Sequence, residues 1–180
     1  MLLKPWYETL FWELVSLMTS AGLGPGAVTG SVVLPTGYSR KAEEDGLRQK
    51  IVEFMRSQLG KAYHLGVEVE WGQEGEAQEW DCSELTEAAY RLAGLTLPDG
   101  AQQQFDATAG ILEPLEGDLG FLWSDTRGKI GHVMVRSGHG ALIHAVGGRG
   151  VVEDLAAKWE THPRWRGWRR HHDLSREVDG

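Results

Sequence analysis

The sequence of 180 residues predicts an α+β fold on two observations. Apolar residues recur at helical spacing in the first half of the chain, and after Pro98 short β-like runs alternate with Gly-rich turns. Helices followed by strands are typical of α+β proteins, whereas strands alternating with helices would indicate a parallel α/β sheet. The 41% of apolar residues suffices for one buried core and lies outside the compositions of disordered chains.

Residues 1–20 predict an amphipathic helix, with Pro5 in its first turn and Gly22 after its end. We expect this helix to pack on the domain or on another subunit. A membrane-surface location is the weaker alternative, because the polar face is not basic. Residues 21–40 predict a connector with one short strand at 31–34. We therefore separate residues 1–40 from a domain of residues 41–180.

The N-terminal region lacks the basic start and uninterrupted apolar stretch of a secretory signal. No apolar run in the sequence approaches the roughly 18 residues of a membrane-spanning helix. We expect a chain that is made in the cytoplasm, with no signal peptide and no transmembrane segment.

A second helix is predicted by an apolar stripe, and Gly60 is well placed to cap it. The stripe consists of Leu47, Ile51, Met55 and Leu59. Residues 67–81 hold six acidic residues and no basic one, which predicts a solvated loop. A third helix is expected from Cys82 to about Leu92, with Asp81 and Glu84 at capping-box spacing. Its expected inner face consists of Leu85, Ala88, Ala89 and Leu92.

The second half of the chain predicts an antiparallel sheet of short strands. The expected strands are Leu119–Trp123, His132–Arg136, Ala141–Ala145 and Val151–Glu153.

Charge and cysteine content exclude several classes of protein. The formal net charge of −8 argues against a mainly nucleic-acid-binding protein. A single cysteine, Cys82, makes neither an internal disulfide nor a Cys-based zinc site. Cys82 is therefore either a buried apolar residue or a reactive group.

Cys82 falls at the first position of its predicted helix, where unpaired backbone N–H groups favour the thiolate over the thiol. A free thiol is only a few per cent ionised at neutral pH, so a nucleophilic cysteine still needs a base. His132 and His144 lie on strands expected to be adjacent, where one imidazole can take the proton while the other fixes its tautomer. Two alternatives stay open: hydrogen-bonded strand histidines without a catalytic role, and a zinc site that includes Asp118.

Six landmarks occur in a specific order along the chain. They are Gly60-Lys61-Ala62-Tyr63, Asp81-Cys82-Ser83, Leu97-Pro98 with Gln102-Gln103-Gln104, Glu116-Gly117-Asp118-Leu119, Gly131-His132-Val133 and Ile143-His144-Ala145. In order and approximate spacing they resemble NlpC-type cell-wall cysteine peptidases, over roughly residues 47–153. The resemblance leaves the N-terminal helix and the C-terminal tail unexplained.

The resemblance implies a papain-like core in which the cysteine, at a helix N-terminus, packs on an antiparallel sheet. It implies Cys82 as nucleophile, His132 as general base and acid, and His144 as the residue that orients His132. It also places Tyr63 near the oxyanion and substrate, beside the backbone N–H of Cys82. The neighbouring positions Asp81, Ser83 and Glu84 are the further candidates for oxyanion or substrate binding. 

The implied substrates and partners are peptidoglycan stem peptides, cleaved between D-glutamate and diaminopimelate or lysine. Neither a metal nor another cofactor is implied. With no export signal, the resemblance suggests a phage endolysin or a virion-associated lysin, and an enzyme of muropeptide recycling is the alternative. A different class of function is a non-catalytic envelope- or virion-binding module on the same scaffold.

Two features depart from the family pattern. Glu84 stands where the family usually has Gly, and a carboxylate there disfavours a nearby thiolate unless it points away. The acidic segment 67–81 is longer than the usual connection, so we expect it to line or partly cover the cleft.

Basic residues and tryptophans alternate near the C-terminus. They are Lys158, Trp159, Arg164, Trp165, Arg166, Trp168, Arg169 and Arg170. We interpret them as a last strand whose Trp side chains pack on the sheet while the Arg side chains meet water. Attachment to anionic envelope polymers or lipid headgroups is the alternative.

Overall fold

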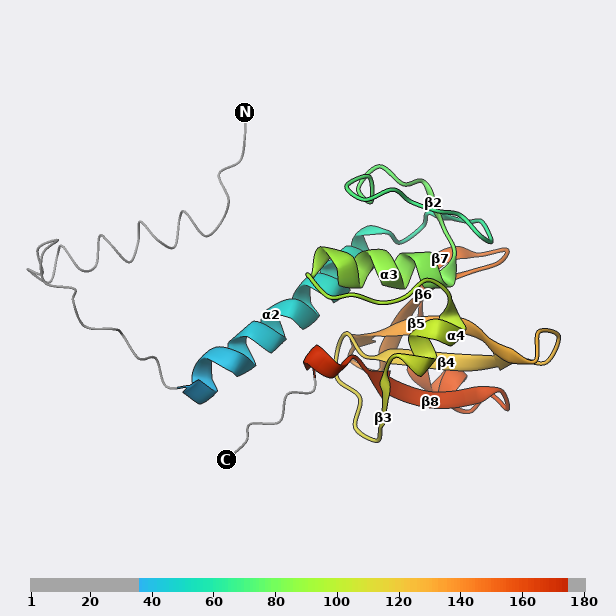
Figure 1. Cartoon of the computed structure of the whole chain (residues 1–180). Coiled ribbons are helices and arrows are strands. Elements are labelled where there is room, and N and C mark those ends of the chain that lie inside the picture. The colour runs from blue at the N-terminus through green and yellow to red at the C-terminus, as the bar shows by residue number, and fades with distance from the viewer. Residues whose placement is uncertain (1–35, 175–180) are drawn as a thin grey trace, which may run out of the picture. The chain divides into compact units, whose positions relative to one another are not determined.

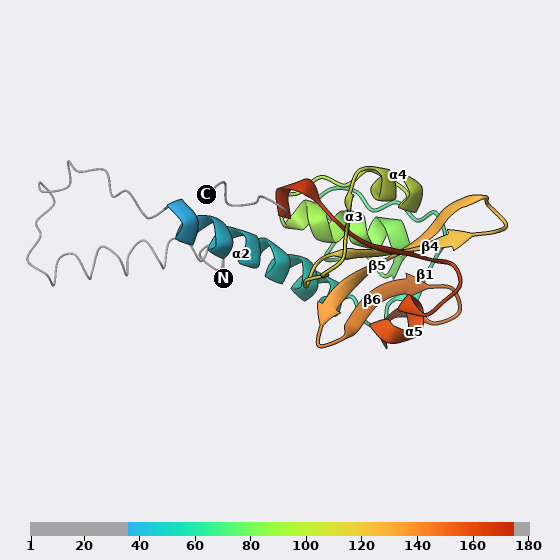
Figure 2. The same cartoon turned by 90° about the horizontal axis from the view of Figure 1, so that it is seen from below.

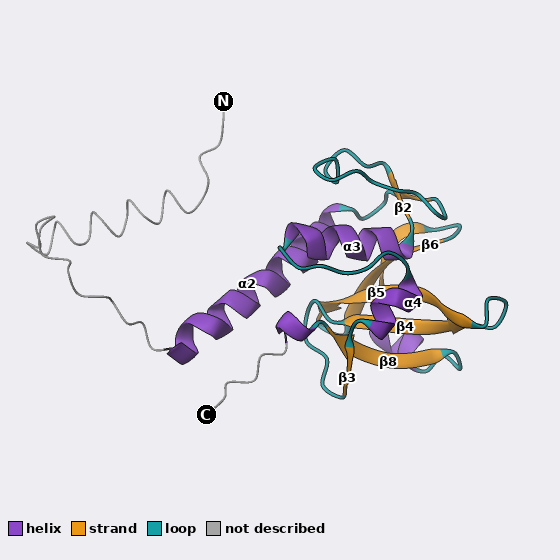
Figure 3. Ribbon diagram, viewed as in Figure 1, coloured by secondary structure: helices purple, strands orange, loops and turns teal. Residues whose placement is uncertain are grey.

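The computed structural model describes residues 36–174 (Figure 1). The helix expected within residues 1–20 and the strand expected at 31–34 lie outside the described residues. In the part described, a six-stranded sheet of order β3-β8-β4-β5-β6-β7 is joined by a small parallel pair, β1-β2. Figure 3 shows the helices and strands by colour. Along the chain, the two longer helices precede the six-stranded sheet. The predicted α+β class is confirmed.

Helix α2 spans Thr36–Ser57 and therefore begins well before the apolar stripe that predicts it. Ile51 and Met55 are fully buried, whereas Leu59 lies beyond the helix end and is 41% exposed, so its place in the stripe was wrong. After the helix come β1 (Ala62–Tyr63) and β2 (Glu79–Trp80), which pair in parallel.

Helix α3 spans Cys82–Leu92, as predicted. Leu85, Ala88 and Ala89 are fully buried, but Leu92 is 49% exposed, so the predicted inner face was wrong at that position. Tyr90 is buried instead, and its hydroxyl donates to the carbonyl of Gly117 at 2.5 Å. The buried face of α3 therefore includes Tyr90 in place of Leu92.

The four predicted strands are present. The first and third are one residue longer than expected, and the second and fourth are twice as long. The four strands are β4 (Leu119–Ser124), β5 (Lys129–Gly138), β6 (Ala141–Val146) and β7 (Gly150–Leu155), and neighbouring members of this set pair antiparallel. Six further elements were not predicted. They are the short strands β1 and β2, α4 (Ala101–Asp106), β3 (Ala109–Ile111), α5 (Ala156–Glu160) and the 3₁₀ turn His172–Leu174. The predicted last strand is β8 (Trp165–Arg170).

The sheet has a different hydrophobic cluster on each face. Alternation along β5 sends Val133 and Val135 into the cluster with α3, and Met134 into the cluster with Ala156 of α5. Figure 2 shows α3 and α5 on opposite sides of the sheet. Cys82 belongs to the α3 cluster.

The small β1-β2 pair is joined to the sheet by backbone contacts with β7. The N–H of Gly60 donates to Val151, and the N–H of Val151 donates to Lys61, both at 2.9 Å. A Cβ at Gly150 would overlap the carbonyl oxygen of Lys61, and φ there is +76°, so this junction requires glycine. The junction places Tyr63 close to the β6-β7 turn, with its ring against Gly147.

A buried carboxylate connects α2 to the sheet. Asp118 is fully buried and accepts from Arg48 at 2.9 Å, from Arg170 at 2.6 Å and from the N–H of Leu115 at 2.7 Å.

No helix within residues 36–174 combines the length and the apolar character needed to cross a membrane.

Candidate active site

Cys82 is held at the first position of α3 by the cap that Asp81 makes. One oxygen of Asp81 accepts from the N–H groups of Ser83 and Glu84 at 2.9 and 2.8 Å, and from the Ser83 hydroxyl at 3.0 Å. The other accepts from the N–H of Gly66 at 3.0 Å. Asp81 and Ser83 thus fix the helix start and the preceding loop.

Cys82 is buried, with 6% of the residue exposed. Burial raises the pKa of Cys82 to about 11, and the nearby Asp81 acts in the same direction. The backbone N–H groups of Val133, Ser83 and Cys82 itself lower it, as expected for a helix start. Desolvation of the sulfur is the larger effect, so the net pKa is raised.

A β-bulge brings β5 to the thiol. Leu122 pairs with His132 and Trp123 pairs with Ile130, so Gly131 is the additional residue on β5. A Cβ at Gly131 would overlap the side chain of Ser124, so the bulge requires glycine.

A cleft of about 230 Å³ opens beside Cys82, and Gly131 lines it as well. The N–H of Val133 faces the sulfur of Cys82, and Gly131 lines the same cleft as Cys82. Both neighbours of His132 in the chain therefore lie close to Cys82.

The side chains of His132 and His144 are in contact, as their spacing predicts. His132 Nε2 and His144 Nδ1 are 2.7 Å apart. His144 is 1% exposed and its Nε2 lies 3.2 Å from Oδ2 of Asp154, a residue that the sequence reasoning missed. Asp154 comes directly after the predicted strand Val151–Glu153, so extending that strand by period two was the signal that could have found it.

The two imidazoles pack against Trp159 of α5. The ring centroid of Trp159 lies 4.8 Å from that of His144 and 6.2 Å from that of His132. Burial lowers the pKa values of both histidines, and their mutual proximity lowers that of His132 further. The thiol thus reaches β5 from the α3 side, the imidazole pair contacts α5, and residues 131–133 connect the two groups.

Tyr63 lies near the same cysteine. Its side chain is partly buried, and burial, Cys82 and Asp81 together raise its pKa, while Arg127 acts against them. The hydroxyl is therefore neutral at physiological pH and available as a hydrogen-bond donor.

Glu84 turns its carboxylate away from the cysteine. One oxygen accepts from the N–H of Val69 at 3.1 Å and lies 3.9 Å from Arg91. Burial raises the pKa of Glu84 to about 7. The expected capping box is therefore only half formed, because Asp81 caps the helix while Glu84 binds the acidic segment.

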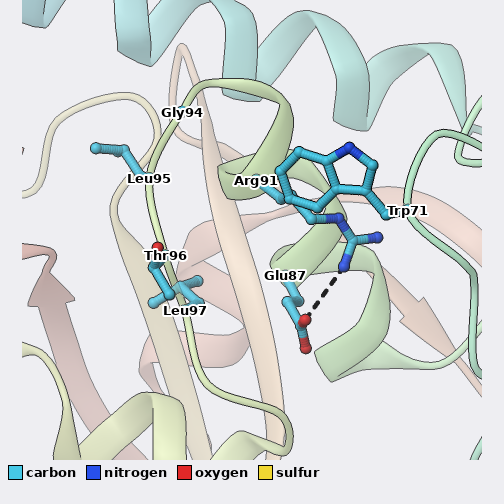
Figure 4. A pocket seen from close by; sticks show the side chains of 7 residues that line it. All are labelled: Trp71, Glu87, Arg91, Gly94, Leu95, Thr96 and Leu97. Atoms are coloured by element: carbon cyan, nitrogen blue, oxygen red, sulfur yellow. Dashed lines mark hydrogen bonds and ion pairs between the residues drawn. The ribbon is translucent and has the colours of Figure 1, made fainter.

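The acidic segment is fastened along α3 and does not form a freely solvated loop. Arg91 binds Glu74, which is 3% exposed, at 2.9 Å and Glu87 at 3.2 Å, and it lies 5.5 Å from the ring centre of Trp71. Figure 4 shows Arg91 with Glu87 and Trp71, which line a pocket of about 310 Å³ together with residues 94–97. Within residues 67–81, Asp81 alone lines the Cys82 cleft. The expectation that the acidic segment lines or partly covers this cleft was therefore wrong.

The zinc site that would include Asp118 is not formed. Two arginines occupy the carboxylate of Asp118, and His132 and His144 bind each other. The side chains present therefore do not converge as a metal-binding set.

Of the C-terminal basic and aromatic segment, residues 165–170 form β8, which lies between β3 and β4. Lys158 and Trp159 belong to α5, so the predicted last strand was wrong for these two residues. Trp168 is buried, as expected. Arg170 binds Asp118, and the Arg169 guanidinium lies 4.0 Å from the ring centre of Phe105, so these two arginines do not simply meet water. Arg166 is exposed, over the ring of Trp123. No contact of this segment indicates envelope attachment.

Comparison with known proteins gives the family. The model of the NlpC/P60 family matches residues 60–170, which begins later than the resemblance in the sequence and includes all of β8. A probable endopeptidase of Corynebacterium glutamicum is 30% identical over 129 residues, covering 71% of this chain and 56% of the relative. The bifunctional muramidase/DL-endopeptidase CwlT of Bacillus subtilis is 34% identical over 96 residues, covering 51% and 29%. The chain thus spans about half, or less, of the length of these relatives.

Solved structures share the fold. The peptidoglycan hydrolase RipB of Mycobacterium tuberculosis has a TM-score of 0.58 at 20% identity, covering 87% of this chain and 77% of its own. The P60 domain of the M. avium subspecies paratuberculosis antigen MAP1204 has a TM-score of 0.58 at 21% identity, covering 71% and 96%. The papain-like α+β fold is confirmed, and the family match over more than half of the residues shows that this chain belongs to the NlpC/P60 family.

Proposed function

We propose that this chain is a cysteine endopeptidase of peptidoglycan stem peptides, with Cys82 as nucleophile, His132 as general base and acid, and His144 as the residue that orients His132. Family membership supports the class of enzyme. The observation that carries the residue roles is the short segment 131–133, which connects the thiol to the bonded imidazole pair.

The resting pair is a neutral thiol and a neutral imidazole, because burial raises the pKa of Cys82 and lowers that of His132. In the proposed reaction the sulfur attacks the peptide carbonyl carbon as His132 takes the thiol proton. His132 then returns that proton to the leaving amine, and water hydrolyses the thioester. Tyr63 and the backbone N–H of Cys82 are the proposed donors to the oxyanion.

We propose the bond between D-glutamate and diaminopimelate or lysine as the one cleaved. The name of the B. subtilis relative includes a DL-endopeptidase activity, which fits this bond. The cleft carries both charges, with Arg127 and Lys129 on one part and Asp81 and Asp99 on another. Such a cleft suits a stem peptide that carries both carboxylates and an amine.

The test is digestion of purified sacculi by the Cys82→Ala variant, with mass spectrometry of the released fragments. We expect wild type to release fragments with a new amine on the diamino acid, and the variant to release none. Iodoacetamide should inactivate the wild type, and EDTA should not. Full activity of Cys82→Ala, with an unchanged melting temperature, would remove the proposal.

The cleft's basic side chains give a second test of the substrate. Arg127→Ala should raise KM for a stem peptide with free carboxylates about three- to tenfold, since one exposed charge contact contributes on the order of 1 kcal/mol. Arg166→Ala is the matched control, because Arg166 lies on β8 outside the cleft. Equal KM values for both variants would contradict this placement of the substrate.

The non-catalytic binding module is the second candidate function. A carboxylate at position 84 supports it only if that carboxylate disfavours the Cys82 thiolate. The structure directs Glu84 to Val69 and Arg91 instead, which weakens this support. A binding module would sediment with sacculi and release no new amine ends.

We propose that the protein acts at the bacterial cell wall, with phage-mediated lysis or wall penetration as the setting. This setting remains a prediction from the sequence. Its test is the turbidity of intact cells after addition of the purified protein from outside, compared with digestion of isolated muropeptides. Activity on muropeptides alone would favour a recycling enzyme.

A further inference from the structure

Asp154 lies next to the imidazole pair on the neighbouring strand. His144 pairs with Val152 and Leu142 pairs with Asp154, so His144 and Asp154 are diagonal neighbours on one face of the sheet. Nε2 of His144 and Oδ2 of Asp154 are 3.2 Å apart. We propose that Asp154 is a positioning residue that sets which ring nitrogen carries the proton on both His144 and His132. The proposal rests on the proposed role of His132 as base.

The proton assignment follows from the contacts one by one. An ionised carboxylate only accepts hydrogen bonds, so Nε2 of His144 must carry a hydrogen. In a neutral imidazole, Nδ1 of His144 is then an acceptor, and it binds the hydrogen on Nε2 of His132, 2.7 Å away. Nδ1 of His132 is left without a hydrogen. It is therefore the ring nitrogen that remains available to accept a proton, which the proposed role assigns to the Cys82 thiol.

The surroundings of Asp154 keep its carboxylate ionised and fixed. Arg149 donates to both oxygens at 2.8 Å, and Trp159 Nε1 donates at 3.1 Å. Lys158 lies 3.4 Å away. Arg149, followed by His144 and Trp159, holds the pKa of Asp154 well below its usual range.

The same surroundings keep His144 neutral. The groups that face it are His132 on β5, Asp154 on β7, Arg149 in the β6-β7 turn, and Lys158 and Trp159 on α5. Burial lowers the pKa of His144 and the two cations lower it further, which outweighs the opposite effect of Asp154. A neutral His144 is what the proton assignment requires, since a charged imidazole would donate from both nitrogens.

A merely structural role for Asp154 would be to tie Arg149 and α5 to β7. Two variants separate these roles. In Asp154→Asn the carbonyl oxygen should take the place of Oδ2, because that position accepts from Arg149 and Trp159 as well as from His144, so the Nε2 hydrogen of His144 keeps its acceptor. Asp154→Ala removes the acceptor, so His144 can carry its hydrogen on Nδ1 and donate it to Nε2 of His132. His132 would then carry its own hydrogen on Nδ1, the wrong nitrogen for a base.

The experiment is ¹⁵N NMR of the histidine ring nitrogens in the full chain at pH 7.5, which needs no substrate. In wild type we expect both His132 and His144 to carry hydrogen on Nε2. Asp154→Ala should move both hydrogens, at least in part, to Nδ1, and Asp154→Asn should leave them on Nε2. Glu153→Gln is the matched control, because Glu153 is the preceding strand residue and binds Ser137 at 2.6 Å. It should change neither ring.

Activity is the second readout. We expect Asp154→Ala to lower kcat on the order of 10- to 100-fold with little change in KM, less than the roughly 10⁴-fold loss when the acidic residue contacts the base directly. Asp154→Asn should recover most of this loss.

A hydrogen on Nδ1 of His132 in wild type would overturn the proposal, even if Asp154→Ala fails to fold. Unchanged ring nitrogens and kcat in a folded Asp154→Ala would do the same. If Cys82→Ala remained active, the proposed function would fail, while the ring-nitrogen result would still report on Asp154.

Discussion

Asp118 and Asp154 are both carboxylates that collect several hydrogen-bond donors, but they lie in different parts of the molecule. Asp118 is fully buried where α2, β4 and β8 meet, and its side-chain partners are two arginines. Asp154 is partly exposed at the end of β7, and its partners include His144. The comparison shows that two similar clusters of donors around a carboxylate can have different roles. One joins distant segments of the fold, and the other reaches the imidazole pair.

The largest effect is expected from Asp118→Ala, which should lower the free energy of unfolding by about 3–5 kcal/mol because it leaves buried arginines without their partner. Urea denaturation measures this loss. The control is Asp125→Ala, which removes an exposed ion pair with Arg164 and should cost less than about 1 kcal/mol. Similar losses for both variants would contradict the view of Asp118 as the link between α2 and the sheet.

The histidine pair should show the opposite behaviour, with large effects on rate and small effects on stability. We expect His132→Ala to lower kcat/KM on the order of 10² to 10⁴, the usual contribution of a positioned acid and base. His144→Ala should cost less, and His144→Asn least, because an amide can still orient the ring of His132. His139→Ala, in the exposed turn between β5 and β6, is the control and should keep full activity.

If His144→Asn proved as damaging as His132→Ala, His144 would do more than orient its neighbour. The ranking among these variants is therefore as informative as the size of any one loss.

The pH dependence sharpens the same contrast. Burial lowers the pKa values of His132 and His144 below 6.5, so both rings stay neutral in the folded protein at pH values where the unfolded chain has begun to take up protons. Their contribution to stability is therefore present above pH 6.5 and is lost as the pH falls below it. The acidic limb of kcat/KM should also lie below pH 6.5, as a value for the coupled pair. An acidic limb at or above pH 7 would contradict a neutral resting pair.

Much of this arrangement could be predicted from the sequence, and the rest has physical reasons for being missed. The position of Cys82 at a helix start and the contact between His132 and His144 follow from local capping and from the strand period. The raised pKa of Cys82 does not, because burial of the sulfur depends on how α3 packs on β5. Asp154 was missed because its role depends on a diagonal neighbour across two strands. Strand β8 was partly foreseen as a last strand, but its position between β3 and β4 rests on long-range pairing.

A third carboxylate, Glu84, gives the smallest expected effect and completes the comparison. It is buried, yet its donors are one backbone N–H and a distant guanidinium, and its pKa is raised to about 7. Its folded pKa exceeds that of the unfolded chain, so its contribution to stability is present below about pH 4.5 and is lost as the pH rises through 7.

Glu84→Gln keeps an acceptor for Val69 and removes the charge, so the variant should gain up to about 1 kcal/mol of stability relative to wild type between pH 5 and pH 8. Chemical denaturation of both proteins at pH 5 and at pH 8 measures this difference in the free energy of unfolding. Because the carboxylate points away from Cys82, kcat should not change. A changed pH dependence of Cys82 alkylation in this variant would show that Glu84 acts on the thiol after all. Glu84 would then belong with Asp154, among the carboxylates that shape the chemistry, and not with Asp118.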